Sequence, residues 1–215
     1  MGVSKKSPSV EETKRALLEA GRKIFASEGF AGARVDRIAR QAGVNKALIN
    51  YHFGGKAQLF KAIIEDFTQD LARGLLVQIR ESDGPETQLR CFIRYMAEMV
   101  SQNPEFPRLL LFESQRLQTE PESPPLHLFL IIQTLGKILE RGQSSGVLKP
   151  INHFFAHFHI MSSFAMYELT RPLREAIRGK APIPEEVFST EAFHAFVESQ
   201  IMAGFLVDPH GSARE

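Results

Sequence analysis

The chain has 215 residues, of which 43% are hydrophobic and 24% are charged, as is ordinary for a soluble globular protein with one large or two small domains. Its single cysteine, Cys91, excludes an internal disulfide, and no apolar run approaches the ~18 residues that span a membrane. We therefore expect a cytoplasmic protein without a membrane partner.

The net charge of +1 hides an asymmetry, because residues 1–61 carry 12 Lys and Arg against 5 Asp and Glu, whereas the remainder carries 14 against 20. A basic end on an acidic body favours a local polyanion-binding surface, with ordinary charge scatter as the alternative.

Almost every segment of the sequence is predicted to be helical, and no strand pair is evident. Residues 1–9 lack the apolar core of a signal peptide and are expected to form a disordered arm. Residues 11–28 repeat apolar groups at helical spacing and end at Gly29. The fold class expected is all-α with about nine helices, which are 11–28, 35–42, 46–53, a long helix from Lys56, 86–102, a helix from Pro104, 126–142, 152–170 and 190–206. Pro172, Pro182 and Pro184 mark a looser segment before the last helix.

Two of these helices, 35–42 and 46–53, are short and lie either side of a tight turn. Gly43 can adopt the left-handed conformation that ends the first helix, and Asn45 is a good N-cap for the second. Gly54 and Gly55 end the second helix. Two short helices joined in this way are typical of a helix-turn-helix, which places its second helix in a DNA major groove. The sequence therefore predicts double-stranded DNA as a partner.

The second short helix has two different sides. At ~100° per residue, Ile49 and Phe53 point in nearly the same direction, which must be the core. The opposite side carries groups that can contact base edges, thymine methyl groups and phosphates. Arg34 and Arg37 lie at the start of the first short helix, 35–42, which in a helix-turn-helix usually crosses the phosphate backbone. The candidate DNA-binding residues are Arg34, Arg37, Lys46, Ala47, Leu48, Asn50, Tyr51, His52 and Lys56. A three-helix packing unit without DNA binding is the alternative; it explains the apolar spacing but not the polar and aromatic face.

Residues 13–60 resemble the N-terminal domain of the tetracycline-repressor (TetR) family of bacterial transcriptional regulators. The resemblance is carried by Ala20, Phe25, Gly29, Phe30, Val35, Ile38, Ala39, Ala42, Gly43, Val44, Lys46, Tyr51, His52, Phe53 and Lys56. Three positions depart from the family pattern. Arg34 stands where a capping threonine is usual, Asn50 replaces a frequent tyrosine, and Gly55 replaces a frequent serine. These departures affect which bases are read more than whether DNA is read.

The resemblance implies a helix-turn-helix DNA-binding domain over 10–56 and a helical ligand-binding and dimerisation domain over 57–208, with a disordered tail over 209–215. It also implies a homodimer that represses transcription by placing its recognition helices ~34 Å apart on a palindromic operator. Members of the family dimerise through their last two long helices, and the candidate interface residues are Phe154, Phe155, Phe158, Ala165, Leu169, Phe193, Phe196, Val197, Ile201 and Phe205. The alternative for these side chains is a place in the core of the protomer.

The resemblance further implies a small-molecule effector that releases the protein from DNA. The middle helices combine aromatic, Met and Leu side chains with occasional polar groups, which suits an apolar or amphipathic effector. The candidate pocket residues are Phe92, Met96, Met99, Phe112, Arg116, Phe129, His157, Met161 and Phe164. The same stripes at helical spacing are also typical of a plain core.

Metal binding and catalysis are not expected. His153 and His157 have an i, i+4 spacing that can share a metal, and His159 lies close by, but no cysteine or acidic residue stands within one turn of the pair. Their alternative is a surface or interface cluster. We expect no cofactor and no enzyme, since the chain has no GxSxG or GxGxxG motif and no Cys pair, and since Glu113 and Arg116 are spaced for an ordinary ion pair. The alternative function is a helical protein–protein adaptor, whose binding, unlike DNA binding, would not weaken steeply with salt.

Overall fold

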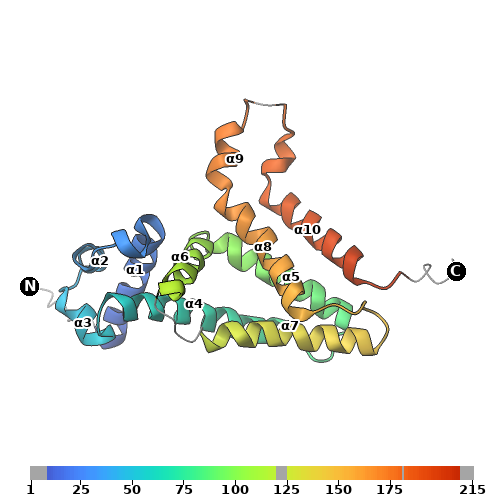
Figure 1. The fold of residues 1–215 in the computed structure, drawn as a ribbon, viewed down its shortest axis with the longest axis horizontal. Helices are drawn as coiled ribbons and strands as arrows, with labels where there is room; N and C mark the ends of the chain where they lie inside the picture. The colour runs from blue at the N-terminus through green and yellow to red at the C-terminus, as the bar shows by residue number, and fades with distance from the viewer. Residues whose placement is uncertain (1–8, 120–124, 181, 209–215) are drawn as a thin grey trace, which may run out of the picture. The chain divides into compact units, whose positions relative to one another are not determined.

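The computed structural model describes residues 9–119, 125–180 and 182–208, so the predicted terminal arm and tail lie outside it apart from Ser9. Within these ranges the chain is helical, which confirms the all-α prediction, and no helix there combines the length and apolar character needed to cross a membrane. The helices, shown in Figure 1, are α1 Val10–Gly32, α2 Val35–Ala42, α3 Ala47–Phe53, α4 Lys56–Gln78, α5 Pro85–Gln102, α6 Phe106–Thr119, α7 Leu126–Ser144, α8 His153–Leu169, α9 Arg171–Ile177, the 3-10 helix η1 Glu185–Phe188, and α10 Thr190–Phe205.

The helix count differs from the prediction because the sequence does not predict α9 or the short 3-10 helix η1. Pro172 marked a break in the sequence, but in the structure it lies in the first turn of α9, where the missing N–H removes no helical hydrogen bond.

At the other end of the chain, Ser9 caps α1. The Ser9 hydroxyl accepts from the backbone N–H of Glu12 at 3.2 Å, and the Glu12 carboxylate accepts from the backbone N–H of Ser9 at 2.7 Å, which is a complete capping box.

The chain folds as two compact units. The first unit comprises the described residues of Met1–Phe67 and Arg108–Ser123, and the second comprises those of Thr68–Pro107 and Pro124–Glu215. The first unit therefore extends past residue 56, where the sequence placed a domain boundary. The reason is that the first turns of α4 bury Leu59, Phe60 and Ile63 in the same core as α1, α2 and α3.

The core of the first unit is built around three phenyl rings. Phe25 and Phe60 are fully buried and meet edge to face with their ring centroids 4.9 Å apart, and the Phe30 centroid lies 5.3 Å from that of Phe60. Ile38 of α2 and Ile49 of α3 are buried against this cluster. The apolar stripes of the three N-terminal helices thus face the core, and this core fixes the orientation of α2 and α3.

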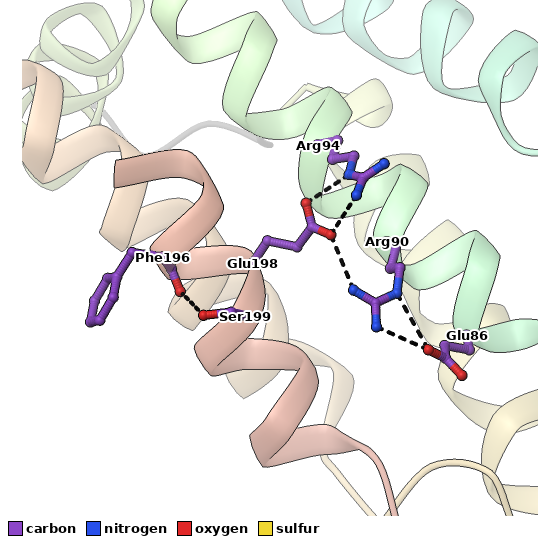
Figure 2. Close-up of polar contacts among 6 residues, drawn as sticks. All are labelled: Glu86, Arg90, Arg94, Phe196, Glu198 and Ser199. Atoms are coloured by element: carbon purple, nitrogen blue, oxygen red, sulfur yellow. Dashed lines mark hydrogen bonds and ion pairs between the residues drawn. The ribbon is translucent and has the colours of Figure 1, made fainter. Parts of the chain in front are cut away.

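In the second unit, α5, α7, α8 and α10 pack on one another, and one carboxylate joins α10 to α5 (Figure 2). Glu198 accepts from Arg94 Nε at 2.7 Å and Nη2 at 2.9 Å, and from Arg90 Nη1 at 3.2 Å, while its side chain is only 13% exposed. Hydrogen bonding from Arg94 first, and then from Arg90, holds the pKa of Glu198 below its ordinary value. Arg90 also donates to Glu86, whereas Phe196 points away from α5.

Glu198→Gln is expected to lower the free energy of unfolding by about 1–3 kcal/mol at neutral pH, because two guanidinium groups lose a charged acceptor. Since the folded pKa is depressed, the carboxylate stabilises the fold above its unfolded pKa of about 4.3, and this contribution is lost as the pH falls through the folded pKa. Urea unfolding should therefore show the gap between parent and variant closing in acid. Glu86→Gln, at a more exposed partner of Arg90, is the control and should cost less than about 1 kcal/mol. A gap that is independent of pH would contradict this role of Glu198.

Candidate DNA-binding site

The local chemistry of α2 and α3 produces the predicted helix-turn-helix. α2 ends at Gly43, which has a φ of +69°, and α3 ends at Gly54, which has a φ of +81°, so both glycines take the left-handed conformation. Asn45 Oδ1 accepts from the backbone N–H of Ala47 at 2.9 Å and caps α3 as expected. Arg34 precedes α2 without a capping hydrogen bond from its side chain, because a guanidinium has no acceptor.

α3 has one buried and one exposed side. Ile49 is 1% exposed, and Phe53 packs against the same core. Leu48, which we placed on the outer face, is half-buried and also packs against this core. His52 is half-buried with its ring centroid 4.9 Å from that of Tyr51. The exposed side is formed by Lys46, Ala47, Asn50 and Tyr51, of which Tyr51 is 79% exposed.

Two of the candidate cations already have carboxylate partners. Arg37 forms an ion pair with Glu28 at the end of α1, and Lys46 Nζ lies 3.0 Å from Asp36 Oδ1 on α2. Arg34 and Arg40 are exposed and form no ion pair with any residue that the structure describes. Arg40 was not among our candidates, although its place on the outer face of α2, one turn after Arg37, was a signal that could have identified it.

Lys56 begins α4 and folds back onto the end of α1. Its Nζ donates to the carbonyl of Ala31 at 3.3 Å and lies 4.8 Å from the centroid of the Phe30 ring, within cation–π range. Partial burial lowers the pKa of Lys56. Lys56 therefore fastens the first turn of α4 to α1, a role that the sequence gave no means of predicting because it depends on a contact 25 residues away.

The candidate pocket residues are divided between the two units. Phe112 and Arg116 belong to the first unit, where they line a cavity of about 370 Å³ with residues 28–31. Arg116 makes the expected ion pair with Glu113, with Nε–Oε2 and Nη2–Oε1 distances of 2.9 Å, and both side chains are buried. The other seven belong to the second unit. The buried ones are Phe92, Met96, His157 and Phe164. Met99 and Met161 are half-buried, and Phe129 is exposed.

None of the seven lines the cavity of about 500 Å³ in the second unit, whose lining residues are Leu76, Ile79, Glu81, Gln88, Thr134, Lys137, Ile138 and Arg141. His157 is nevertheless unusual, because it is 6% exposed and its Nδ1 has no hydrogen-bond partner among the residues that the structure describes. Burial lowers the pKa of His157 to about 4, so the ring is neutral at pH 7. No three His, Cys, Asp or Glu side chains in the described ranges lie close enough together to hold a metal ion.

The candidate dimer residues differ in exposure. Phe154, Phe155, Phe158 and Phe196 are exposed, whereas Ala165, Leu169 and Phe193 are half-buried. Val197, Ile201 and Phe205 are 5%, 1% and 7% exposed within the single chain, so they pack into its own core and are not available to a partner. Their helical stripe marks the inner side of α10. Met166, which we did not predict, is 60% exposed on α8.

Comparison with known proteins matches both units. Residues 17–63 match the model described as bacterial regulatory proteins of the tetR family, and residues 85–186 match a tetracyclin repressor-like C-terminal domain. The HTH-type transcriptional regulator RutR of Escherichia coli (strain K12) is 30% identical over 188 residues, which is 86% of this chain and 86% of that protein.

A second relative, the HTH-type transcriptional repressor NicS of Pseudomonas putida, is 26% identical over 182 residues, covering 76% of this chain and 85% of that protein. The crystal structure of SCO4942 from Streptomyces coelicolor has the same fold, with a TM-score of 0.69 at 23% identity, over 90% of this chain and 98% of that chain. The helix-turn-helix of α2 and α3 lies inside the matched N-terminal segment. The chain therefore belongs to the tetR family and is a DNA-binding transcriptional regulator.

Proposed function

We propose that the protein is a homodimeric repressor that reads a palindromic operator with the exposed side of α3 and is released by a small apolar or amphipathic effector. The observation that carries the proposal is the exposed Tyr51 on a seven-residue helix that Ile49 anchors to the core. A short, anchored helix with exposed polar and aromatic side chains fits a major groove about 12 Å wide.

The proposed contacts follow from the chemistry of each side chain. The Asn50 amide can donate to and accept from adenine in the major groove, and Ala47 can contact a thymine methyl group. The Tyr51 hydroxyl can reach a base or a phosphate. Arg34 and Arg40 are exposed at the two ends of α2 and supply charge for phosphates.

The proposed dimer face consists of Phe154, Phe155 and Phe158 on α8 with Phe196 on α10. α8 and α10 contact one another, as Figure 1 shows, and these four side chains are between 41% and 75% exposed. Several exposed aromatic side chains on adjacent helices are typical of a subunit interface, because exposing them to water is unfavourable. Two copies of the helix-turn-helix then match the two half-sites of a palindrome.

Phe155→Glu is expected to convert the dimer into a monomer, since a carboxylate at the centre of an apolar interface loses its hydration without a partner. Sedimentation equilibrium at micromolar concentration measures the mass, and we expect about twice 24.2 kDa for the parent and 24.2 kDa for the variant. Val77→Glu changes an equally exposed apolar residue on α4 and should leave the mass at the dimer value. A monomeric parent, or a dimeric Phe155→Glu variant, would contradict the proposed interface.

The proposed effector site lies in the second unit, among α5, α7 and α8. We propose that the buried side chains of Phe92 and Met96 on α5 and Phe164 on α8 form its apolar wall. His157 on α8 would supply a neutral imidazole whose Nδ1 has no hydrogen-bond partner among the described residues. An apolar wall with one available polar atom suits an effector that is mainly apolar and carries a single hydrogen-bonding group. To act as an inducer it must favour the non-binding state, and typical coupling free energies are about 1–3 kcal/mol.

A further inference from the structure

The helix-turn-helix surface carries acidic side chains beside two of the cations proposed to meet DNA. Asp36 on α2 lies 3.0 Å from Lys46 Nζ, and both side chains are more than half exposed, at 56% and 67%. Glu28 holds Arg37 in the same manner but is only 21% exposed. The Lys46 pair is therefore open to solvent on both sides, at the N-terminal end of α3.

A carboxylate and a phosphate compete for the same ammonium group. Each phosphate neutralised by a free cation releases counterions from the DNA, and this release makes the slope of log K against log salt steeper by about 0.9. A lysine already neutralised by an internal carboxylate gains less from a phosphate, and the carboxylate itself repels the backbone. Such a pair therefore weakens DNA binding that depends on charge alone.

Sequence-specific contacts are affected differently. A lysine can donate to guanine O6 and N7, and an aspartate can accept from the cytosine amino group, so the matching base pair can satisfy both members of the pair. Non-specific binding depends on contacts with phosphates, which attract Lys46 and repel Asp36. The same ion pair therefore penalises non-specific binding more than binding at a matching site.

We propose that Asp36 is a positioning residue for DNA specificity, which holds Lys46 and so suppresses binding to non-specific DNA. This inference rests on the proposed function, in which Lys46 faces DNA. The Asp36 carboxylate acts through the Lys46 ammonium, so removing the carboxylate frees a cation for phosphate.

The test is the binding of the full chain to a 30-bp duplex of mixed sequence, followed by fluorescence anisotropy between about 50 and 200 mM salt. Asp36→Asn is expected to bind about 3- to 10-fold more tightly at the lower salt, with a slope steeper by about 0.9 for each protomer that meets the DNA. Asp36→Glu keeps the charge and should restore the parent values. Asp70→Asn removes a carboxylate from an exposed ion pair with Arg73 in the second unit and should change the affinity less than about 2-fold.

A double-mutant cycle separates the ion pair from the change in net charge. In a Lys46→Met background, Asp36→Asn should change the affinity for the duplex no more than Asp70→Asn changes it. Lys46→Met alone should leave the salt slope near that of the parent, a result that does not depend on how well Asp36→Asn folds. Three results would overturn the proposal. Asp36→Asn could change the affinity no more than Asp70→Asn does, or its gain in affinity could persist in the Lys46→Met background. Lys46→Met alone could reduce the slope of log K against log salt by about 0.9, the value for one phosphate contact.

Tyr51→Ala tests the proposed function separately, in binding to the DNA upstream of the protein's own gene. If Tyr51→Ala binds like the parent, α3 does not face DNA and the proposed function is wrong. If Tyr51→Ala weakens binding while Asp36→Asn has no effect, only the role of Asp36 is wrong.

Discussion

Phe60→Ala is expected to lower the free energy of unfolding of the first unit by about 3–5 kcal/mol. Phe60 is fully buried, and its ring packs against those of Phe25 and Phe30 at centroid distances of 4.9 Å and 5.3 Å. Truncation removes the apolar side chain that α4 contributes to this aromatic cluster and leaves a cavity that close-packed neighbours fill only in part. Because whole domains are stable by about 5–15 kcal/mol, a loss of this size is enough to impair folding of the helix-turn-helix.

The measurement is urea unfolding followed by circular dichroism, with Tyr51→Ala as the matched control. Tyr51 is also an aromatic residue of the first unit, but it is 79% exposed, so its truncation should change the stability by no more than about 0.5 kcal/mol. A loss below about 1 kcal/mol in Phe60→Ala would show that the aromatic cluster is not the core that holds α4 to α1.

Tyr51→Ala is expected to have the largest effect on DNA binding. Its side chain has little contact with the core, so its removal should act on the DNA contact and leave the fold unchanged. A lost specific contact costs about 1–2 kcal/mol, and the symmetric dimer that we propose would lose it twice on a palindrome. The affinity should therefore fall about 30- to 1,000-fold, measured as dissociation constants at one fixed salt concentration.

The helix-turn-helix could be predicted from the sequence because its determinants are local. Gly43 and Gly54 end their helices through their own backbone conformation, and Asn45 caps α3 through a hydrogen bond two residues along the chain. The directions of Ile49 and Phe53 follow from the helical repeat alone. Each of these features depends on residues no more than four positions apart in the chain, so the printed sequence contains the required information.

Contacts between distant segments could not be predicted in the same way. Helical periodicity identifies an apolar face but does not indicate the core against which that face packs. The sequence therefore assigns Phe112 and Arg116 to one pocket with residues of the second unit, although both belong to the first. The same limit applied to Val197 and Ile201, which face the core of their own chain. The contact of Lys56 with Ala31 joins α4 to α1 and has no local signature.

Whether the exposed side of α3 reads DNA is tested most directly by comparing the parent with Tyr51→Ala on the DNA upstream of its own gene. Leu173→Ala is the control, because Leu173 is 66% exposed on α9 in the second unit. We predict that the parent and Leu173→Ala bind with equal affinity, whereas Tyr51→Ala, folded and dimeric, binds at least 30-fold more weakly, an estimate that assumes about 1 kcal/mol lost in each protomer. Binding of Tyr51→Ala at the parent affinity would contradict the assignment of α3 as the recognition helix.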